Sequence, residues 1–224
     1  MKSEISSFAV ECLTACVLLA MGPRTWAAES RLLWHIGEPD HNDAEFALAP
    51  NRYSSFRDDP FFVVGKSDAK RDWPYVQPGP ADSWAGGRQH QFTIAFGLLN
   101  GPLSGDCRLR LDLVDTHGTA PPGLRITVNG TPLRPTADRR AFQLPPGAGD
   151  ASVNGQPDQG KPSRLEVPFP AKLLKEGANE IALTTVLGSW LLYDWIGLET
   201  PPYVELAAVT GALVSSVESL PTAP

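Results

Sequence analysis

Residues 91–130, QFTIAFGLLNGPLSGDCRLRLDLVDTHGTAPPGLRITVNG, contain the pattern that decides the fold. Hydrophobic residues occupy every second position in three successive runs, at 92–98, 109–113 and 124–128. A two-residue period places alternate side chains on opposite faces of a strand, so each run predicts a strand with one buried and one solvated face. The pair Asn129-Gly130 tolerates positive φ at both centres of a type I′ turn and predicts a hairpin there.

Short hydrophobic runs continue on both sides of this stretch, and each predicts a further strand. They occupy residues 31–37, 61–65, 164–169, 179–186 and 189–199. Glycine and proline, at 20 and 22 of the 224 residues, supply the turns between them. Residues 170–177 begin with proline and end with glycine, which predicts one short helical turn. The sequence therefore predicts an all-β fold, an antiparallel β-sandwich with one short helical turn and a single sizeable core.

The N-terminal residues 1–28 have the features of a secretory signal peptide. Lys2 precedes a hydrophobic run at 8–21, and Ala27-Ala28 offers a cleavage site with small side chains. The run is shorter than the roughly 20 residues that span a bilayer, so we expect a protein secreted to the periplasm or the extracellular space, without a membrane anchor. Residues 29–200 are then the sandwich, and 201–224 are a linker or the truncated start of a following region.

Charge and cysteine content narrow the range of partners and chemistry. The net charge of −6 and the pI near 5.2 disfavour nucleic acid and anionic membrane surfaces, both of which attract basic proteins. Signal cleavage after residue 28 would remove Cys12 and Cys16 and leave Cys107. We therefore expect no internal disulfide, and we expect Cys107 to be a small buried residue.

Acidic residues in unusual surroundings require an explanation. The loop at 38–47 contains Asp40, Asp43 and Glu45, whose oxygens suit a structural calcium ion. The loop lacks the spacing of a recognised calcium-binding loop, so a solvated acidic loop is the simpler interpretation, and no other cofactor is expected. Asp194 lies inside a hydrophobic run, where a carboxylate needs a hydrogen-bonding partner, either within the protein or on a ligand.

Two long segments without a strand pattern offer candidates for a binding site. Residues 66–87 carry Trp73, Tyr75 and Trp84 among charged residues and prolines. Large aromatic side chains argue against disorder in a loop of this length, and they either stack on sugar rings or cover the end of the core. The second segment, 145–163, is rich in glycine, proline, aspartate and asparagine. It either lines a polar cleft or is mobile.

Two blocks of sequence resemble a known family. The first contains LWHIGEPD (33–40), VGKS (64–67) and DWPY (72–75), and the second contains LRITVNG (124–130), VPFP (167–170), EGANEI (176–181) and YDWIGLE (193–199). In this order they resemble the C-terminal β-sandwich module of rhamnogalacturonan lyases, polysaccharide lyase family 4, over residues 31–200. The resemblance implies a jelly-roll, galactose-binding-domain-like fold and an association with carbohydrate. The catalytic domain of those lyases is a separate domain ahead of the sandwich, and no residue here matches one of its catalytic positions.

Three functional hypotheses follow. The leading one is a non-catalytic carbohydrate-binding or accessory module that binds plant-type polysaccharide or oligosaccharide and supports a catalytic domain in the same or a neighbouring chain. Its candidate ligand contacts are Trp73, Tyr75, Trp84, Arg88, His90, Asp72 and Asp150. The second is a polysaccharide lyase or a glycosidase, which would need a carboxylate pair, drawn from Asp72, Asp82 and Asp150 in the case of a glycosidase. The third is a purely structural sandwich of a larger enzyme. Binding predicts at least two exposed loop rings beside polar groups, whereas the structural role predicts buried rings.

Overall fold

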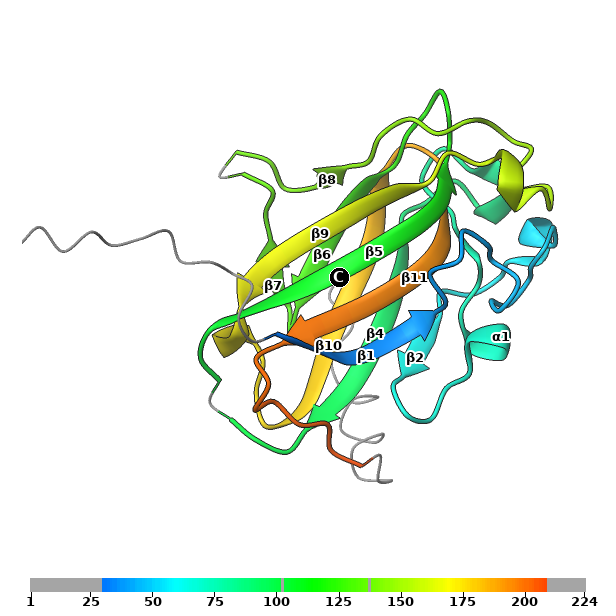
Figure 1. Cartoon of the computed structure of the whole chain (residues 1–224). Helices are drawn as coiled ribbons and strands as arrows, with labels where there is room; N and C mark the ends of the chain where they lie inside the picture. Colours follow the sequence, from blue (N-terminus) through cyan, green and yellow to red (C-terminus); the bar gives the residue numbers. More distant parts are fainter. Residues whose placement is uncertain (1–29, 102, 137, 209–224) are drawn as a thin grey trace, which may run out of the picture.

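The computed structural model describes residues 30–101, 103–136 and 138–208 of the chain. Two β-sheets pack face to face (Figure 1). The first sheet has the strand order β1 (Arg31–Gly37), β11 (Leu191–Thr200), β5 (Asp106–Thr116) and β9 (Ser163–Pro170), with β3 (Val76–Gln77) paired to β11. The second has the order β2 (Phe61–Val63), β4 (His90–Leu98), β10 (Gly177–Leu187), β6 (Gly123–Val128) and β7 (Thr131–Leu133), with β8 (Phe142–Gln143) paired to β6.

The predicted antiparallel β-sandwich is confirmed, with one local exception. All strand pairs are antiparallel except β2 and β4, which run parallel. The alternating residues form the core between the sheets, where Phe92, Ile94 and Leu111 are fully buried. Asn129 and Gly130 adopt φ values of 49° and 76° between β6 and β7, as the hairpin prediction requires.

Helical structure is confined to single turns. The predicted turn at 170–177 is present as a 3₁₀ turn at Ala171–Leu173. The long segments contain further turns, namely α1 (Ala69–Asp72) and 3₁₀ turns at Ser83–Ala85 and Pro157–Gln159, and another lies at Tyr53–Ser55. Within the described residues, no helix has the length and hydrophobicity that crossing a membrane requires.

Of the two segments that flank the predicted sandwich, the structure describes part of the C-terminal one and none of the predicted signal peptide. The predicted signal peptide at 1–28 lies outside the described residues. After β11 the chain continues beside β4, where Leu206 forms an antiparallel bridge with Leu98 and the Leu99 N–H donates to the carbonyl of Glu205 over 2.9 Å. Cys107 is a free and buried thiol, as predicted, and burial raises its pKa to about 12.

Two of the predicted ligand contacts, Trp73 and Tyr75, are part of the hydrophobic core. Both side chains are 0% exposed. The Trp73 ring packs edge-on against Phe92 and Tyr193 with ring centroids 5.2 and 5.4 Å apart. The Tyr75 hydroxyl donates a 2.6 Å hydrogen bond to the carbonyl of Val153. The predicted stacking of these rings on sugar is therefore wrong, because pairing of β3 with β11 draws residues 73–77 beneath the end of the sheets.

A buried polar network joins the two sheets next to these rings. The Gln77 side-chain amide, which follows Trp73 and Tyr75 into the core, donates to the carbonyls of His90 on β4 and Leu183 on β10 over 2.9 and 2.8 Å. Its carbonyl oxygen accepts a hydrogen bond from the hydroxyl of Tyr193 on β11. All polar atoms of the amide are thus satisfied without water, which makes this buried group compatible with a stable core.

We expect Trp73→Ala to lower the free energy of unfolding by about 3–5 kcal/mol, because it leaves a cavity among Phe62, Phe92 and Tyr193. Urea denaturation followed by circular dichroism measures this loss. The matched control is Leu99→Ala, at a side chain that is 58% exposed, where a change below about 0.5 kcal/mol is expected. Equal effects of the two substitutions would contradict the placement of Trp73 in the core.

Candidate functional site

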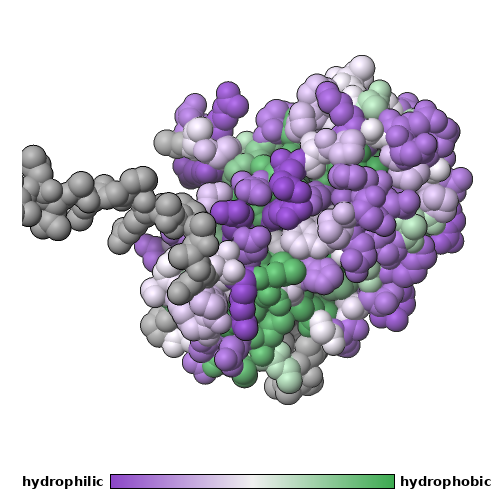
Figure 2. Space-filling view, viewed as in Figure 1, coloured by the Kyte–Doolittle hydropathy of each residue, from purple (hydrophilic) through white to green (hydrophobic). Residues whose placement is uncertain are grey.

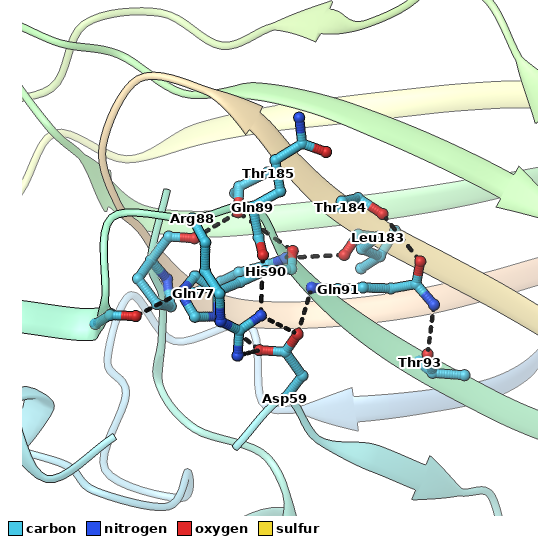
Figure 3. Close-up of polar contacts among 12 residues, drawn as sticks. Asp59, Gln77, Arg88, Gln89, His90, Gln91, Thr93, Leu183, Thr184 and Thr185 are labelled. Atoms are coloured by element: carbon cyan, nitrogen blue, oxygen red, sulfur yellow. Dashed lines mark hydrogen bonds and ion pairs between the residues drawn. The ribbon is translucent and has the colours of Figure 1, made fainter. Parts of the chain in front are cut away.

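Arg88 and His90 converge on the carboxylate of Asp59 at the start of β4 (Figure 3). His90 Nδ1 lies 2.6 Å from Asp59 Oδ1, and Arg88 Nη1 donates to Asp59 Oδ2 over 3.1 Å. The Gln91 N–H donates to the same Oδ2 over 3.0 Å. On its other side, His90 Nε2 lies 3.0 Å from the carbonyl of Ala85. Both ring nitrogens of His90 therefore face oxygen atoms of the protein.

This cluster fixes the loop before β4 rather than presenting a ligand site. His90 is 0% exposed, so its predicted contact with a ligand is wrong. Burial alone would raise the pKa of Asp59, but hydrogen bonds from His90, Gln91 and Arg88 outweigh it and hold the pKa below its usual value. Arg88 is exposed, but its guanidinium is already paired with this carboxylate.

The remaining predicted contacts lie apart on different segments. Trp84 is half-buried, packs edge-on against Tyr53 with ring centroids 5.0 Å apart, and donates its Nε1–H to Asp82 over 3.2 Å. Asp72, at the end of α1, is bound by Arg71, which lowers its pKa. Asp150 is exposed in the second long loop. The structure thus brings Arg88 and His90 together through Asp59, and it joins neither Asp72 nor Asp150 to them by any contact described.

The three carboxylates predicted as calcium ligands have different surroundings. Asp40 Oδ1 accepts the Asn42 N–H, and Glu45 Oε1 accepts the Glu38 N–H. Asp43 is 1% exposed, and both of its carboxylate oxygens are buried without a hydrogen-bond partner in the described part of the chain. Among residues 30–208, apart from 102 and 137, no group of three or more His, Cys, Asp and Glu side chains is placed to hold a metal ion. The calcium site remains a prediction.

The outer face of the first sheet gathers polar side chains that the sequence prediction did not select. The residues that point outward from this sheet are aligned by the strand register into two neighbouring rows across the four strands. One row consists of Gly37, Trp195, Asp112 and Arg164, and the next consists of His35, Gly197, Arg110 and Glu166. Together these positions form what we term the sheet face. Figure 2 shows hydrophilic residues across β9, β5 and β11 on this side of the molecule, with hydrophobic residues gathered below them.

Trp195 lies flat along the sheet at the centre of this face. A Cβ atom at position 197 would clash with the Trp195 ring, so glycine is what allows the indole to rest on the backbone of β11. The His35 ring lies nearly parallel to the indole, at an angle of 17° and a centroid distance of 6.2 Å. The Arg110 guanidinium lies over the ring, 4.8 Å from its centroid, a cation–π contact. Trp195 is therefore only 6% exposed.

Charged side chains surround the indole. Asp112 is shared by two guanidinium groups, with Arg110 Nε at 3.0 Å and Arg164 Nε at 2.7 Å from its Oδ1. Burial alone would raise the pKa of Asp112, but the hydrogen bonds of the two arginines outweigh it and keep the pKa below its usual value. Arg108 lies 3.6 Å from Glu166 in the next part of the sheet. The sheet face thus surrounds one flat aromatic ring with charged donors and acceptors that pair with one another.

The sequence contained a signal for this face. Ile196 and Leu198 point into the core, so their neighbours Trp195 and Gly197 point outward. The prediction instead selected aromatic residues in loops, because the direction of Trp195 depends on the bulge at Asp194, which sequence periodicity does not reveal.

Residues 32–198 match the protein family described as CBM-like, polysaccharide lyase family 4, domain III. A curated relative, the rhamnogalacturonate lyase of Dickeya dadantii (strain 3937), is 28% identical over 183 residues, which cover 76% of this chain and 28% of the relative. Among solved structures, a family 35 carbohydrate-binding module from an environmental isolate aligns with a TM-score of 0.40 and 14% identity over 80% of this chain and 100% of that one. CBM35 from Cellvibrio japonicus Abf62 aligns with a TM-score of 0.35 and 12% identity over 81% and 94%.

We expect the stability of the protein to depend on the protonation of Asp43. Burial, and then the charge of Glu45, raises the pKa of Asp43 from 3.8 to about 7. The folded protein therefore holds this proton more tightly than the unfolded chain, and stability falls as the pH rises from about 4 to about 7. Asp43→Asn removes this pH dependence. The free energy of unfolding of the variant relative to that of wild type should therefore rise by about 2 kcal/mol or more between about pH 4 and about pH 8.

Urea denaturation of both proteins across this pH range, with a chelator present, measures the difference. Taking the difference between variant and wild type removes the contributions of the other titrating groups. Parallel stability curves would show that Asp43 titrates as an ordinary exposed carboxylate.

Proposed function

Because the chain belongs to the CBM-like family of polysaccharide lyase family 4 domain III modules, we propose that it is a non-catalytic carbohydrate-binding module that supports a glycan-active enzyme. The observation that carries this proposal is the sheet face, where Trp195 lies flat among His35, Arg110, Asp112 and Arg164. Sugar-binding sites combine an apolar surface for the ring faces with a few fixed polar groups for the hydroxyls. The sheet face offers both.

Contact with the indole requires the Arg110 side chain to move aside. Arg110 lies beside Glu166 of β9 in the strand register, so a second carboxylate is available to receive its guanidinium. Asp112 remains paired with Arg164 when Arg110 leaves. The exchange leaves the buried carboxylate of Asp112 with one cation, so exposing the ring creates no unpaired buried charge.

The proposed ligand is a plant-type polysaccharide, in keeping with the name of the rhamnogalacturonate lyase relative, of which this chain spans 28%. A module of this kind raises the concentration of an attached or neighbouring catalytic domain at the polymer, which is an effect of avidity. We also propose that the protein is exported, on the strength of the signal-like sequence at residues 1–28.

The three carboxylates predicted for glycoside hydrolysis do not have the properties of a catalytic pair. A glycosidase acid needs a raised pKa and a second carboxyl group opposite it. Of the three residues considered for this role, Asp72 has a pKa lowered by its hydrogen bond with Arg71. Asp82 accepts hydrogen bonds from Trp84 and Ser189 at one oxygen and from the Gly79 N–H at the other. Asp150 is exposed.

A structural role is the second candidate function, and a specific observation favours it. The loop rings Trp73 and Tyr75 are buried, as the structural hypothesis predicted. In that role the sandwich would pack against a catalytic domain, and the charged sheet face would be a solvated surface.

We expect Trp195→Ala to lower the affinity for polysaccharide at least about tenfold, equivalent to about 1.4 kcal/mol, through loss of the stacking surface. A glycan array identifies the ligand, and isothermal titration measures the affinity of wild type and variant. Trp84→Ala is the matched control, since this half-buried ring lies in a loop on a different part of the sandwich. Circular dichroism establishes that both variants are folded.

Loss of binding in Trp84→Ala together with retention in Trp195→Ala would show that the ligand binds at the loops and not at the sheet face. Absence of binding to any glycan by the wild-type protein would leave the structural role as the function.

A further inference from the structure

A pocket of about 390 Å³, which we term the edge pocket, lies between the end of β1 and α1. β1 is the edge strand of the first sheet, and Figure 1 shows α1 beyond its tip. His35 and Gly37 line the edge pocket and also belong to the sheet face. The edge pocket therefore continues the sheet face past its last strand.

The floor of the edge pocket is apolar and rigid. It is formed by Ile36 and Phe62, which are 2% and 6% exposed and belong to the hydrophobic core, and by the half-buried Ala69. Because the floor presents little accessible surface, contacts with a ligand come mainly from the polar side chains at the rim.

The rim offers donors and acceptors that solvent reaches. Its exposed residues are His35, Glu38, Asp68 and Lys70, and its half-buried polar residues are Glu45 and Ser67. Within the described residues, the Asp68 carboxylate makes no capping hydrogen bond. Glu45 Oε1 accepts the Glu38 N–H over 2.8 Å, and its Oε2 accepts no hydrogen bond from the described part of the chain. Lys70 Nζ donates one proton to the Ala44 carbonyl, which leaves two for a ligand.

Both walls of the edge pocket are held in place by the protein itself. Asp194 Oδ1 accepts the N–H groups of Asp40 and His41 in the turn after β1, over 3.2 and 2.9 Å. The predicted need of Asp194 for a hydrogen-bonding partner is thus met within the protein. On the other wall, the bond from Lys70 to Ala44 ties α1 to the acidic loop. A site that is ordered before its ligand arrives loses less conformational entropy on binding.

The charges at the rim favour an uncharged ligand. Glu38, Glu45 and Asp68 supply three carboxylates, and Lys70 supplies one ammonium group. A ligand carboxylate would meet an excess of like charge, whereas hydroxyl groups can donate to the carboxylates and accept from Lys70. Burial raises the pKa of Glu45, so this environment already disfavours negative charge.

His35 links the edge pocket to the indole of the sheet face. Its ring lies nearly parallel to that of Trp195, with centroids 6.2 Å apart. His35 Nδ1 lies 3.1 Å from the Gly37 carbonyl, which can only accept, so Nε2 of the neutral ring is the nitrogen that can accept a ligand hydroxyl. A ligand that leaves the indole over His35 therefore crosses β11 and β1 towards α1.

We propose that the edge pocket is a second sugar subsite, which binds an uncharged unit of a polysaccharide chain whose neighbouring part lies on the sheet face. Hydroxyl groups of this unit donate to Asp68 and Glu45 and accept from Lys70. This inference rests on the proposed carbohydrate binding, and it adds the direction of the chain and the charge of one of its units.

Titration of the purified protein with two series of oligosaccharides, each two to six units long, tests the proposal. One series contains neutral chains of galactose or arabinose, and the other contains uronic chains of galacturonic acid. We expect neutral chains to bind at least about tenfold more tightly than uronic chains of equal length, because uronic units meet the carboxylates of the rim.

Asp68→Ala should weaken the binding of neutral chains about tenfold, since it removes a charged hydrogen-bond acceptor. Asp68→Asn keeps hydrogen-bonding atoms but removes the charge, so it should narrow the preference for neutral chains by strengthening the binding of uronic ones. Lys70→Ala should weaken the binding of neutral chains. The matched controls, Asp158→Ala and Lys172→Ala, change exposed residues of other turns and should bind like wild type. Circular dichroism establishes that each variant is folded.

The outcomes separate the subsite from the function. Binding that depends on Trp195 but is unchanged in Asp68→Ala and Lys70→Ala overturns the second subsite and leaves carbohydrate binding intact. Uronic chains that bind wild type as tightly as neutral ones, or more tightly, overturn the assignment of an uncharged unit. Absence of binding to every member of both series overturns the subsite together with the function on which it rests.

Discussion

The close approach of the Trp195 indole to the β11 backbone at Gly197 is the contact on which the account of this protein depends. β11 lies between β1 and β5 and also pairs with β3, so its alternation fixes both sides of the first sheet. Ile196 and Leu198 are 0% exposed in the core, and the intervening positions must then face outward. Glycine at 197 leaves room for the ring to lie flat, and His35 and Arg110 pack beside it. One strand thereby supplies the centre of the core and the centre of the candidate binding surface.

Several buried or partly buried carboxylates hold loops in place. Asp115 Oδ1 accepts the Ala148 N–H, and its Oδ2 accepts the Ser152 hydroxyl, which fixes the second long loop. Asp59 secures the start of β4, and Asp194 secures the turn after β1 through His41. Hydrogen bonds to charged groups are stronger than neutral ones, which suits buried ties between distant segments. Asp43 is the exception, since its buried oxygens have no partner in the described residues.

Periodicity in the sequence was sufficient for the fold and insufficient for the site. The runs at 92–98, 109–113 and 124–128 became β4, β5 and β6, and Asn129-Gly130 formed the predicted turn, because these features depend on local geometry. Whether a loop ring points inward is decided by distant pairing, as β3 with β11 shows for Trp73 and Tyr75. The sheet face is harder to predict from sequence, since the outward direction of Trp195 follows the Val114 and Asp194 bulges and the register of β11 with its neighbours. The family resemblance supplied the jelly-roll assignment and the association with carbohydrate. It gave no role to Asp194 or Trp195, although both lie in its YDWIGLE block.

The central claim is that ligand meets the protein on the outer side of β1, β11, β5 and β9. Its most direct test is the change in backbone amide NMR shifts when a bound oligosaccharide is titrated into the isotope-labelled protein. Gly197 and Gly37 are useful probes, since both belong to the sheet face and glycine amides are well resolved. The account predicts that the largest shifts occur at Gly37, Gly197 and their neighbours on β5 and β9. Shifts confined to residues 66–87 and 145–163, with the sheet face unchanged, would contradict it.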